Sequence, residues 1–103
     1  MMIAAIALAL QAAQPSAMLD PEFLAADDAW LECRDARLSE VLAAGGKAKA
    51  AVKAAFAGCS AEEAALRAIL VARLGEAEGG AAMERIRGFS RAMMLRRAQG
   101  MGL

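Results

Sequence analysis

The chain has 103 residues and a formal net charge of zero, because 12 Lys and Arg balance 12 Asp and Glu. This length limits it to one domain with a modest core. Without a positive balance the chain does not resemble a general nucleic-acid binder, so no nucleic-acid partner is expected. His is absent, which removes nucleophile–His pairs, His metal ligands and any side chain that titrates near neutrality. We therefore expect no enzyme and no cofactor.

The composition favours helices throughout the chain. Hydrophobic residues make up 59% of it, but 29 of them are Ala, a strong helix former that contributes little burial. Thr and Tyr are absent, and no stretch alternates apolar with polar residues long enough for a half-buried strand. We therefore predict an all-α fold.

The amino-terminal segment is typical of an export signal. No charged side chain precedes Asp20, and Met1 to Leu10 form an apolar run. A run of about 10 residues suits a signal peptide and is too short to span a bilayer, which takes roughly 20. We predict a signal peptide over residues 1–13, with cleavage possible up to Ala17, and a periplasmic or secreted protein. A first helix of a cytosolic protein and an uncleaved membrane anchor are the alternatives.

After this segment, residues 18–103 are expected to form a single small helical domain. Asp20-Pro21 is a good helix start, with a side-chain cap followed by Pro in the first turn. The first helix should cover about 21–44 and end at Gly45-Gly46. Its apolar residues fall in a stripe about 120° wide at 100° per residue, an ordinary core face. They are Phe23, Leu24, Trp30, Leu31, Leu38, Val41 and Leu42.

A second helix is predicted over about 47–77. Apolar side chains keep one phase from Val52 through Cys59 to Leu70, which favours one long helix, bent at most at Gly58. The alternative is a break, because Ser60-Ala61-Glu62-Glu63 also matches a capping box. Two helices joined by Gly45-Gly46 would form an antiparallel hairpin.

The two cysteines are placed symmetrically about this turn. Cys33 and Cys59 have residue 46 as their midpoint, so in an antiparallel hairpin they lie opposite each other. An even number of cysteines in a small exported protein favours a disulfide, and we predict Cys33–Cys59. In a cytosolic protein both would instead be reduced core residues.

A third helix, basic and amphipathic, is predicted over about 81–98 after a flexible joint at residues 75–80. Residues 80–103 carry five basic side chains and one acidic, whereas residues 18–46 carry two basic and seven acidic. The helix either packs its Met and Phe face on the hairpin, with its arginines near the first helix, or meets an anionic membrane surface or a partner. The candidate partner or membrane surface consists of Trp30, Ile86, Phe89, Met93, Met94, Arg91, Arg96 and Arg97.

Charged residues also fall on the apolar stripes. Asp27 and Arg34 lie near the middle of the first helix's stripe, seven residues apart and too far for an easy mutual salt bridge. They either extend to the edge of the stripe or form a polar groove near Trp30, with Glu63 a candidate partner for Arg34. No sequence pattern indicates a metal site.

The sequence thus predicts a helical hairpin with one disulfide and a third, basic helix. Its composition and compartment suggest a noncatalytic interaction or structural module of the bacterial cell envelope. The alternative is a protein that associates with membrane surfaces through its basic carboxyl-terminal helix. A protein partner, a homodimer and an anionic membrane surface are the candidate binding partners.

Overall fold

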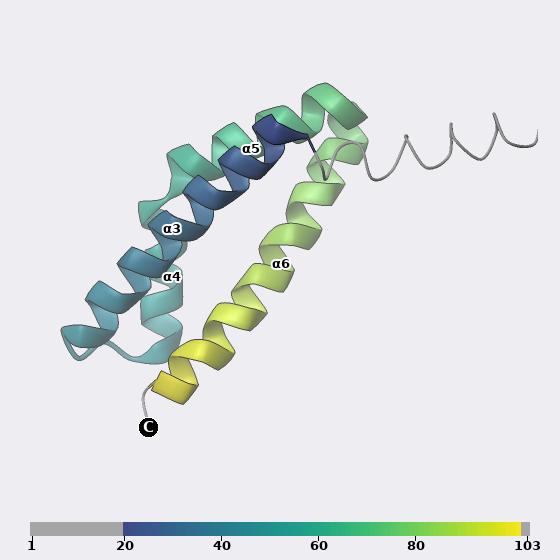
Figure 1. Ribbon diagram of the computed structural model, residues 1–103. Helices are drawn as coiled ribbons and strands as arrows, with labels where there is room; N and C mark the ends of the chain where they lie inside the picture. Colours follow the sequence, from purple (N-terminus) through teal and green to yellow (C-terminus); the bar gives the residue numbers. More distant parts are fainter. Residues whose placement is uncertain (1–19, 102–103) are drawn as a thin grey trace, which may run out of the picture.

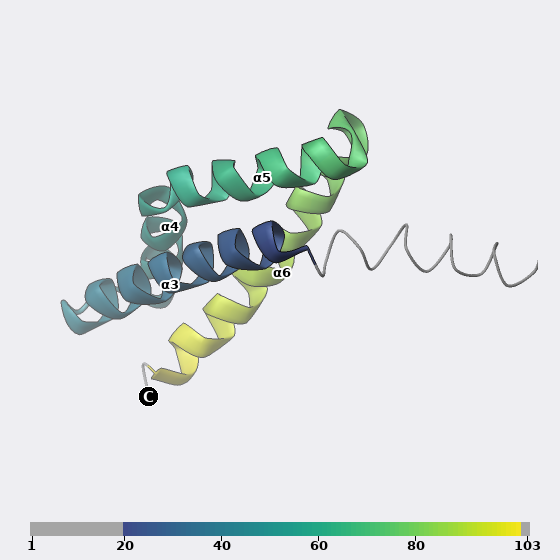
Figure 2. The same cartoon turned by 45° about the horizontal axis from the view of Figure 1, so that its top comes forward.

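The computed structural model describes residues 20–101, which form four α-helices and no strand. They are α3 (Pro21–Ala43), α4 (Ala48–Gly58), α5 (Ser60–Leu74) and α6 (Glu76–Met101). α5 lies beside α3, and α6 returns past them from the far end of α5 (Figures 1 and 2). The all-α prediction is confirmed. The predicted signal peptide over 1–13, with its cleavage positions up to Ala17, lies outside the described residues.

α3 begins where the sequence predicts. Oδ1 of Asp20 accepts a hydrogen bond from the Glu22 N–H at 2.8 Å, and Pro21 occupies the first turn. The helix ends at Ala43, one residue before the predicted end, and Gly45 follows with φ +91°. A Cβ at Gly46 would lie 2.5 Å from Cγ1 of Val41, so this tight turn requires glycine there.

The prediction of one long helix over 47–77 was wrong. Cys59 leaves the helical conformation, with φ −119° and ψ 29°, and α5 starts at the next residue in a different direction (Figure 2). The break lacks the side-chain cap that a capping box would provide. The apolar phase continues across it because α4 and α5 both pack against α3. A shared neighbour, and not backbone continuity, therefore explains the phase.

The predicted flexible joint at 75–80 was also wrong, whereas the predicted helix over 81–98 is present as part of α6 (Glu76–Met101). Gly75 alone separates α5 from α6, with φ +89° and ψ 166°, a conformation open only to glycine. Gly79 lies inside α6, where a Cβ would fall 2.6 Å from Cα of Val71. The missing side chain at Gly79 therefore permits a close crossing of α5 and α6.

All four helices contribute to one core. Trp30 on α3 has no exposed surface and meets Phe56 on α4 edge to face, with ring centroids 5.8 Å apart. α6 adds Met83, Met94 and Ala98. The remaining buried apolar residues are Phe23, Leu38, Ala51, Val52, Ala55, Cys59, Leu66 and Leu70. Part of the predicted Met face of α6 is thus packed on the hairpin.

Ion pairs between helices surround this core. Arg73 on α5 donates to Asp20 at the start of α3 at 2.7 Å, and Arg67 on α5 donates to Glu84 on α6 at 2.7 Å. Arg97 on α6 donates to Asp35 on α3 at 3.0 Å, so one arginine of α6 meets the acidic first helix. No helix within residues 20–101 combines the length and hydropathy needed to cross a bilayer.

Candidate functional site

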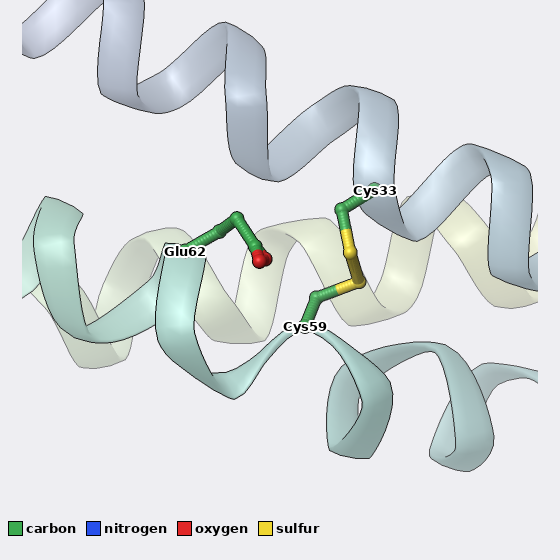
Figure 3. Close-up of side chains that lie close together, drawn as sticks. All are labelled: Cys33, Cys59 and Glu62. Atoms are coloured by element: carbon green, nitrogen blue, oxygen red, sulfur yellow. A yellow bond between two sulfur atoms is a disulfide. The ribbon is translucent and has the colours of Figure 1, made fainter.

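The disulfide joins α3 to the junction of α4 and α5. Cys33 and Cys59 are bonded, with their Cα atoms 6.0 Å apart, as the symmetry about the Gly45-Gly46 turn predicts. The Glu62 carboxylate lies close to both sulfur atoms, all within 4.8 Å (Figure 3). Since the two sulfurs are bonded to each other, neither is a thiolate that could bind a metal ion. This cluster is therefore a structural bridge with a carboxylate beside it.

The residues predicted as a partner or membrane surface do not share one face. Phe89 and Met93 are 70% and 48% exposed, whereas Met94 belongs to the core and Ile86 is half-buried. Trp30, which the sequence suggested for the same surface, is fully buried. Arg91, Arg96 and Arg97 are exposed but line two different grooves.

The first groove runs between α3 and α6, and we call it the α3–α6 groove. α3 and α6 approach each other only at isolated points, in contrast to the close contact of α6 with α5. The space between them has a volume of about 720 Å³. Its lining comprises Leu31, Arg34 and Asp35 from α3, and Phe89, Ser90, Met93, Met94, Arg96 and Arg97 from α6. Most of the predicted surface residues of α6 thus meet here.

Leu31 was missed as part of this site. The sequence placed it in the buried stripe of α3, but it is 39% exposed. At 100° per residue, Leu24 and Leu31 lie toward one margin of that stripe, while the buried Trp30 lies at the other margin. Angular position alone therefore did not distinguish Leu31, which is exposed, from Trp30, which is buried.

The second groove runs between α4 and α6, and we call it the α4–α6 groove. It has a volume of about 570 Å³, and four basic side chains and no acidic one line it. Arg87 and Arg91 place their guanidinium carbons 5.3 and 5.5 Å from the centre of the Phe56 ring. The lining comprises Lys49, Val52, Lys53, Phe56, Ala57, Arg87, Arg91 and Leu95. This groove is apolar at its floor and cationic at its rim.

Arg34 is the unusual member of the α3–α6 groove. It is only 2% exposed, and its guanidinium carbon lies 3.9 Å from the centre of the Trp30 ring. Burial lowers its pKa, while the negative charges of Asp35, Asp27 and Glu63 oppose this effect. Among residues 20–101, no acceptor meets its Nε or Nη1. Arg34 is thus a buried cation with free donors.

The partner that the sequence suggested for Arg34 does not pair with it directly. Glu63, suggested by the sequence, accepts a hydrogen bond from Arg87 of α6 at 3.4 Å instead. Asp27 is half-buried, and its loss of hydration raises its pKa, an effect that the charge of Arg34 partly offsets. Arg34 does not extend to the edge of the α3 stripe but lies beside Trp30 and lines a groove.

Comparisons with known proteins add no relative to this picture. No protein-family model matches the chain, and neither curated proteins nor solved structures gave a match. The functional argument therefore depends on the grooves themselves. Their apolar side chains and arginines are suited to holding an apolar or anionic group, because Arg supplies several directed hydrogen-bond donors.

Proposed function

We propose that the protein is an exported, noncatalytic helical module of the bacterial cell envelope that binds an apolar group of a partner molecule in the α3–α6 groove. The observation that supports this most directly is the cluster of Leu31, Phe89 and Met93. These three large apolar side chains are 39%, 70% and 48% exposed, and they line one groove from two helices. Apolar groups gathered on a surface commonly mark a binding site.

Export is supported by two features. A disulfide joins Cys33 and Cys59, and such bonds persist mainly in oxidising compartments such as the periplasm or outside the cell. The apolar run of residues 1–10 suits a secretion signal. A periplasmic or secreted location would also keep the bridge intact.

The chemistry of the lining supports a noncatalytic role. The α3–α6 groove contains one hydroxyl that could in principle act as a nucleophile, that of Ser90. The chain has no His that could activate it as a base. The carboxylate in the same groove, that of Asp35, already accepts a hydrogen bond from Arg97. Such a lining favours binding over bond making or breaking.

Binding of the neutral apolar dye Nile red tests this proposal. We expect the folded protein to bind the dye and the double variant Phe89→Ser, Met93→Ser to lose most of that binding, since it removes the apolar lining from α6. Leu95→Ser, which changes the α4–α6 groove, is the matched control and should bind as the wild type does. Equal binding by wild type and double variant would contradict the proposal.

Sedimentation velocity distinguishes a second copy of the chain from another partner. A dimer that the Phe89→Ser, Met93→Ser variant converts to a monomer would identify the partner as a second copy. A monomer that still binds the dye would leave the groove open to a different molecule. A monomer that binds no dye would contradict the proposed site.

A second candidate function is association with an anionic membrane surface. The α4–α6 groove favours it, because Lys49, Lys53, Arg87 and Arg91 surround an apolar floor without an acidic side chain. We would expect binding to vesicles of anionic phospholipid, little binding to vesicles of neutral phosphatidylcholine, and a loss with Arg91→Ala and with a combined Lys49→Ala, Lys53→Ala change. Binding that persists in neutral lipid, or that survives these changes, would argue against this function.

A further inference from the structure

The free donors of Arg34 indicate what kind of group the α3–α6 groove holds, an inference that rests on the proposed function of this groove. Removing a guanidinium from water is unfavourable unless hydrogen-bond acceptors replace the lost hydration. Arg34 is 2% exposed, and no acceptor among the described residues meets its Nε or Nη1. The Trp30 ring, 3.9 Å away, covers one face of the guanidinium but accepts no hydrogen bond from Nε or Nη1.

The charges around the groove favour an anion at this position. Its lining includes three basic side chains and one acidic, Asp35. Arg97 donates to Asp35 at 3.0 Å, which leaves Arg34 and Arg96 to attract a ligand. An acceptor that entered the groove beside Arg34 would replace the hydration that this side chain has lost.

We propose that the α3–α6 groove binds a monocarboxylate with an unbranched apolar chain, its carboxylate on Arg34 and its chain along Leu31, Phe89 and Met93. A planar guanidinium fits a carboxylate well, because two parallel N–H donors can meet the two oxygens. Met93 and Met94 border the groove, and unbranched Met side chains adapt readily, so they can move aside to admit the carboxylate.

The surroundings of Arg34 favour a single negative charge over a double one. Asp27, Asp35 and Glu63 are near enough to influence its pKa, and each would repel a second charge on a ligand. A phosphate monoester, which carries nearly two charges at neutral pH, is therefore less suited to this position than a carboxylate.

The shape and lining favour a hydrocarbon chain over a peptide. A volume of about 720 Å³ lies within the range of small-molecule sites. Residues 89–97 of α6 extend the lining by about 12 Å at 1.5 Å per residue. A peptide would bring backbone N–H and C=O groups against Leu31, Phe89 and Met93, where few partners could satisfy them. A methylene chain has no hydrogen-bonding groups that need partners.

Titration with dodecanoate, kept below its micelle-forming concentration, tests the proposal. Trp30 is the single Trp of the chain and lies against Arg34, so its fluorescence reports events at the guanidinium. The matched neutral probe is 1-dodecanol, which shares the chain and lacks the charge. We expect dodecanoate to bind roughly tenfold to a hundredfold more tightly, the range of a charge-assisted hydrogen bond.

Variants of the arginines assign this preference to Arg34. In Arg34→Met, which keeps an unbranched side chain, dodecanoate and dodecanol should bind equally well. Arg96→Met removes the same charge from the rim and should alter the preference less than about threefold, because an exposed charge is screened by solvent. Arg34→Lys keeps the charge without the planar fork and should show an intermediate preference, which keeps the test available if Arg34→Met does not fold.

The outcomes separate this inference from the proposed function. Equal binding of dodecanoate and dodecanol by the wild type, or an unchanged preference in Arg34→Met or Arg34→Lys, would overturn the carboxylate site while leaving an apolar groove. No binding of dodecanol or Nile red would overturn the groove itself. Tighter binding of acetyl-Leu-Leu-Leu than of dodecanoate, lost in Arg34→Met, would overturn the hydrocarbon chain in favour of a protein carboxyl terminus.

Discussion

α3 has two unlike neighbours. On one side α4 and α5 are joined to it by the Cys33–Cys59 bond, by the contact of Trp30 with Phe56 and by the Arg73–Asp20 ion pair. On the other side α6 approaches it only at isolated points, and a groove separates them. α6 is held instead by α5 and α4.

The difference shows how a small helical chain can keep large apolar side chains exposed without losing its core. Met83, Met94 and Ala98 bury α6 against the rest of the protein, while Phe89 and Met93 of the same helix stay exposed. Stability should therefore depend on the closed side of α3 and on the α5–α6 crossing. The exposed row facing α3 is then available for a ligand.

Breaking the closed side should have the largest effect. Cys33→Ser removes the disulfide, whose loop spans 26 residues, and should lower the free energy of unfolding by about 3 to 4 kcal/mol through the added freedom of the unfolded chain. This corresponds to a fall in Tm of roughly 15 to 25 °C in circular dichroism without reductant. Wild type with reductant should approach the variant, and equal melting under nonreducing conditions would contradict the prediction.

Shortening Met83 or Met93 to Ala tests which neighbouring helices hold α6 in place. Met83 is fully buried and Met93 is 48% exposed, so the same change to Ala should have unequal costs. We expect Met83→Ala to lower the free energy of unfolding by about 2 to 4 kcal/mol and Met93→Ala by less than about 1 kcal/mol. Denaturant titration measures both. Similar losses would mean that α6 depends on α3 as much as on α5.

Adjacent glycines sharpen the same comparison at the α5–α6 crossing. A Cβ at Gly79 would lie 2.6 Å from Cα of Val71, so Gly79→Ala must push the helices apart and should cost about 1 to 3 kcal/mol. At Gly80 the nearest atom is 3.7 Å away, and Gly80→Ala should be neutral or stabilising by up to about 1 kcal/mol. Thermal melting of both variants provides the comparison, and destabilisation by both would argue against a close crossing.

Acid should weaken the closed side through Asp20. The hydrogen bond from Arg73, together with that from the Glu22 N–H, holds the pKa of Asp20 below its ordinary 3.8. A lowered pKa in the folded state stabilises the protein above about pH 4, and this contribution is lost as pH falls through the folded-state value. Asp20→Asn should therefore lower Tm at pH 7. On acidification, the Tm of this variant should fall by less than the Tm of the wild type. An unchanged acid profile would contradict this role.

Ionisation of Asp27 should change stability with pH in the opposite direction to that of Asp20, and its effect should be the smallest. Loss of hydration raises its pKa above 3.8, so the stability that it contributes is present below that value and is lost as pH rises through the folded-state pKa. Asp27→Asn, which cannot ionise, should raise Tm slightly at pH 7 and leave it nearly unchanged at about pH 3. A lower Tm at pH 7 would show that attraction to Arg34 outweighs the loss of hydration.

Local sequence signals predicted the start of α3 and the turn that follows it. Asp20 marks the helix start because its side chain accepts a hydrogen bond from the first turn, and Pro21 does so because its φ is already restricted to a helical value. Both effects are local and do not depend on tertiary contacts. Gly45 and Gly46 mark the turn, because one needs a positive φ and the other has no room for a side chain. The disulfide was predicted from symmetry about that turn, and the helix break leaves this symmetry intact because it falls at Cys59 itself.

The candidate site was predicted only in part. Phe89, Met93, Arg96 and Arg97 were named from the amphipathic pattern of their helix, and all four line the α3–α6 groove. Leu31 was assigned to the core and Arg34 to the edge of a stripe or a polar groove near Trp30. Periodicity gives the direction of a side chain from its own helix axis, but it does not say how far the neighbouring helix stands away.

The sequence by itself determined the all-α class, the hairpin turn and the cysteine pairing, because these depend on backbone propensity and on distances along the chain. The tertiary structure decided the break at Cys59, the crossing at Gly79 and the separation of α3 from α6. Those features arise where segments distant in sequence compete for space. The burial of Arg34 beside a groove is likewise a result of how the helices pack.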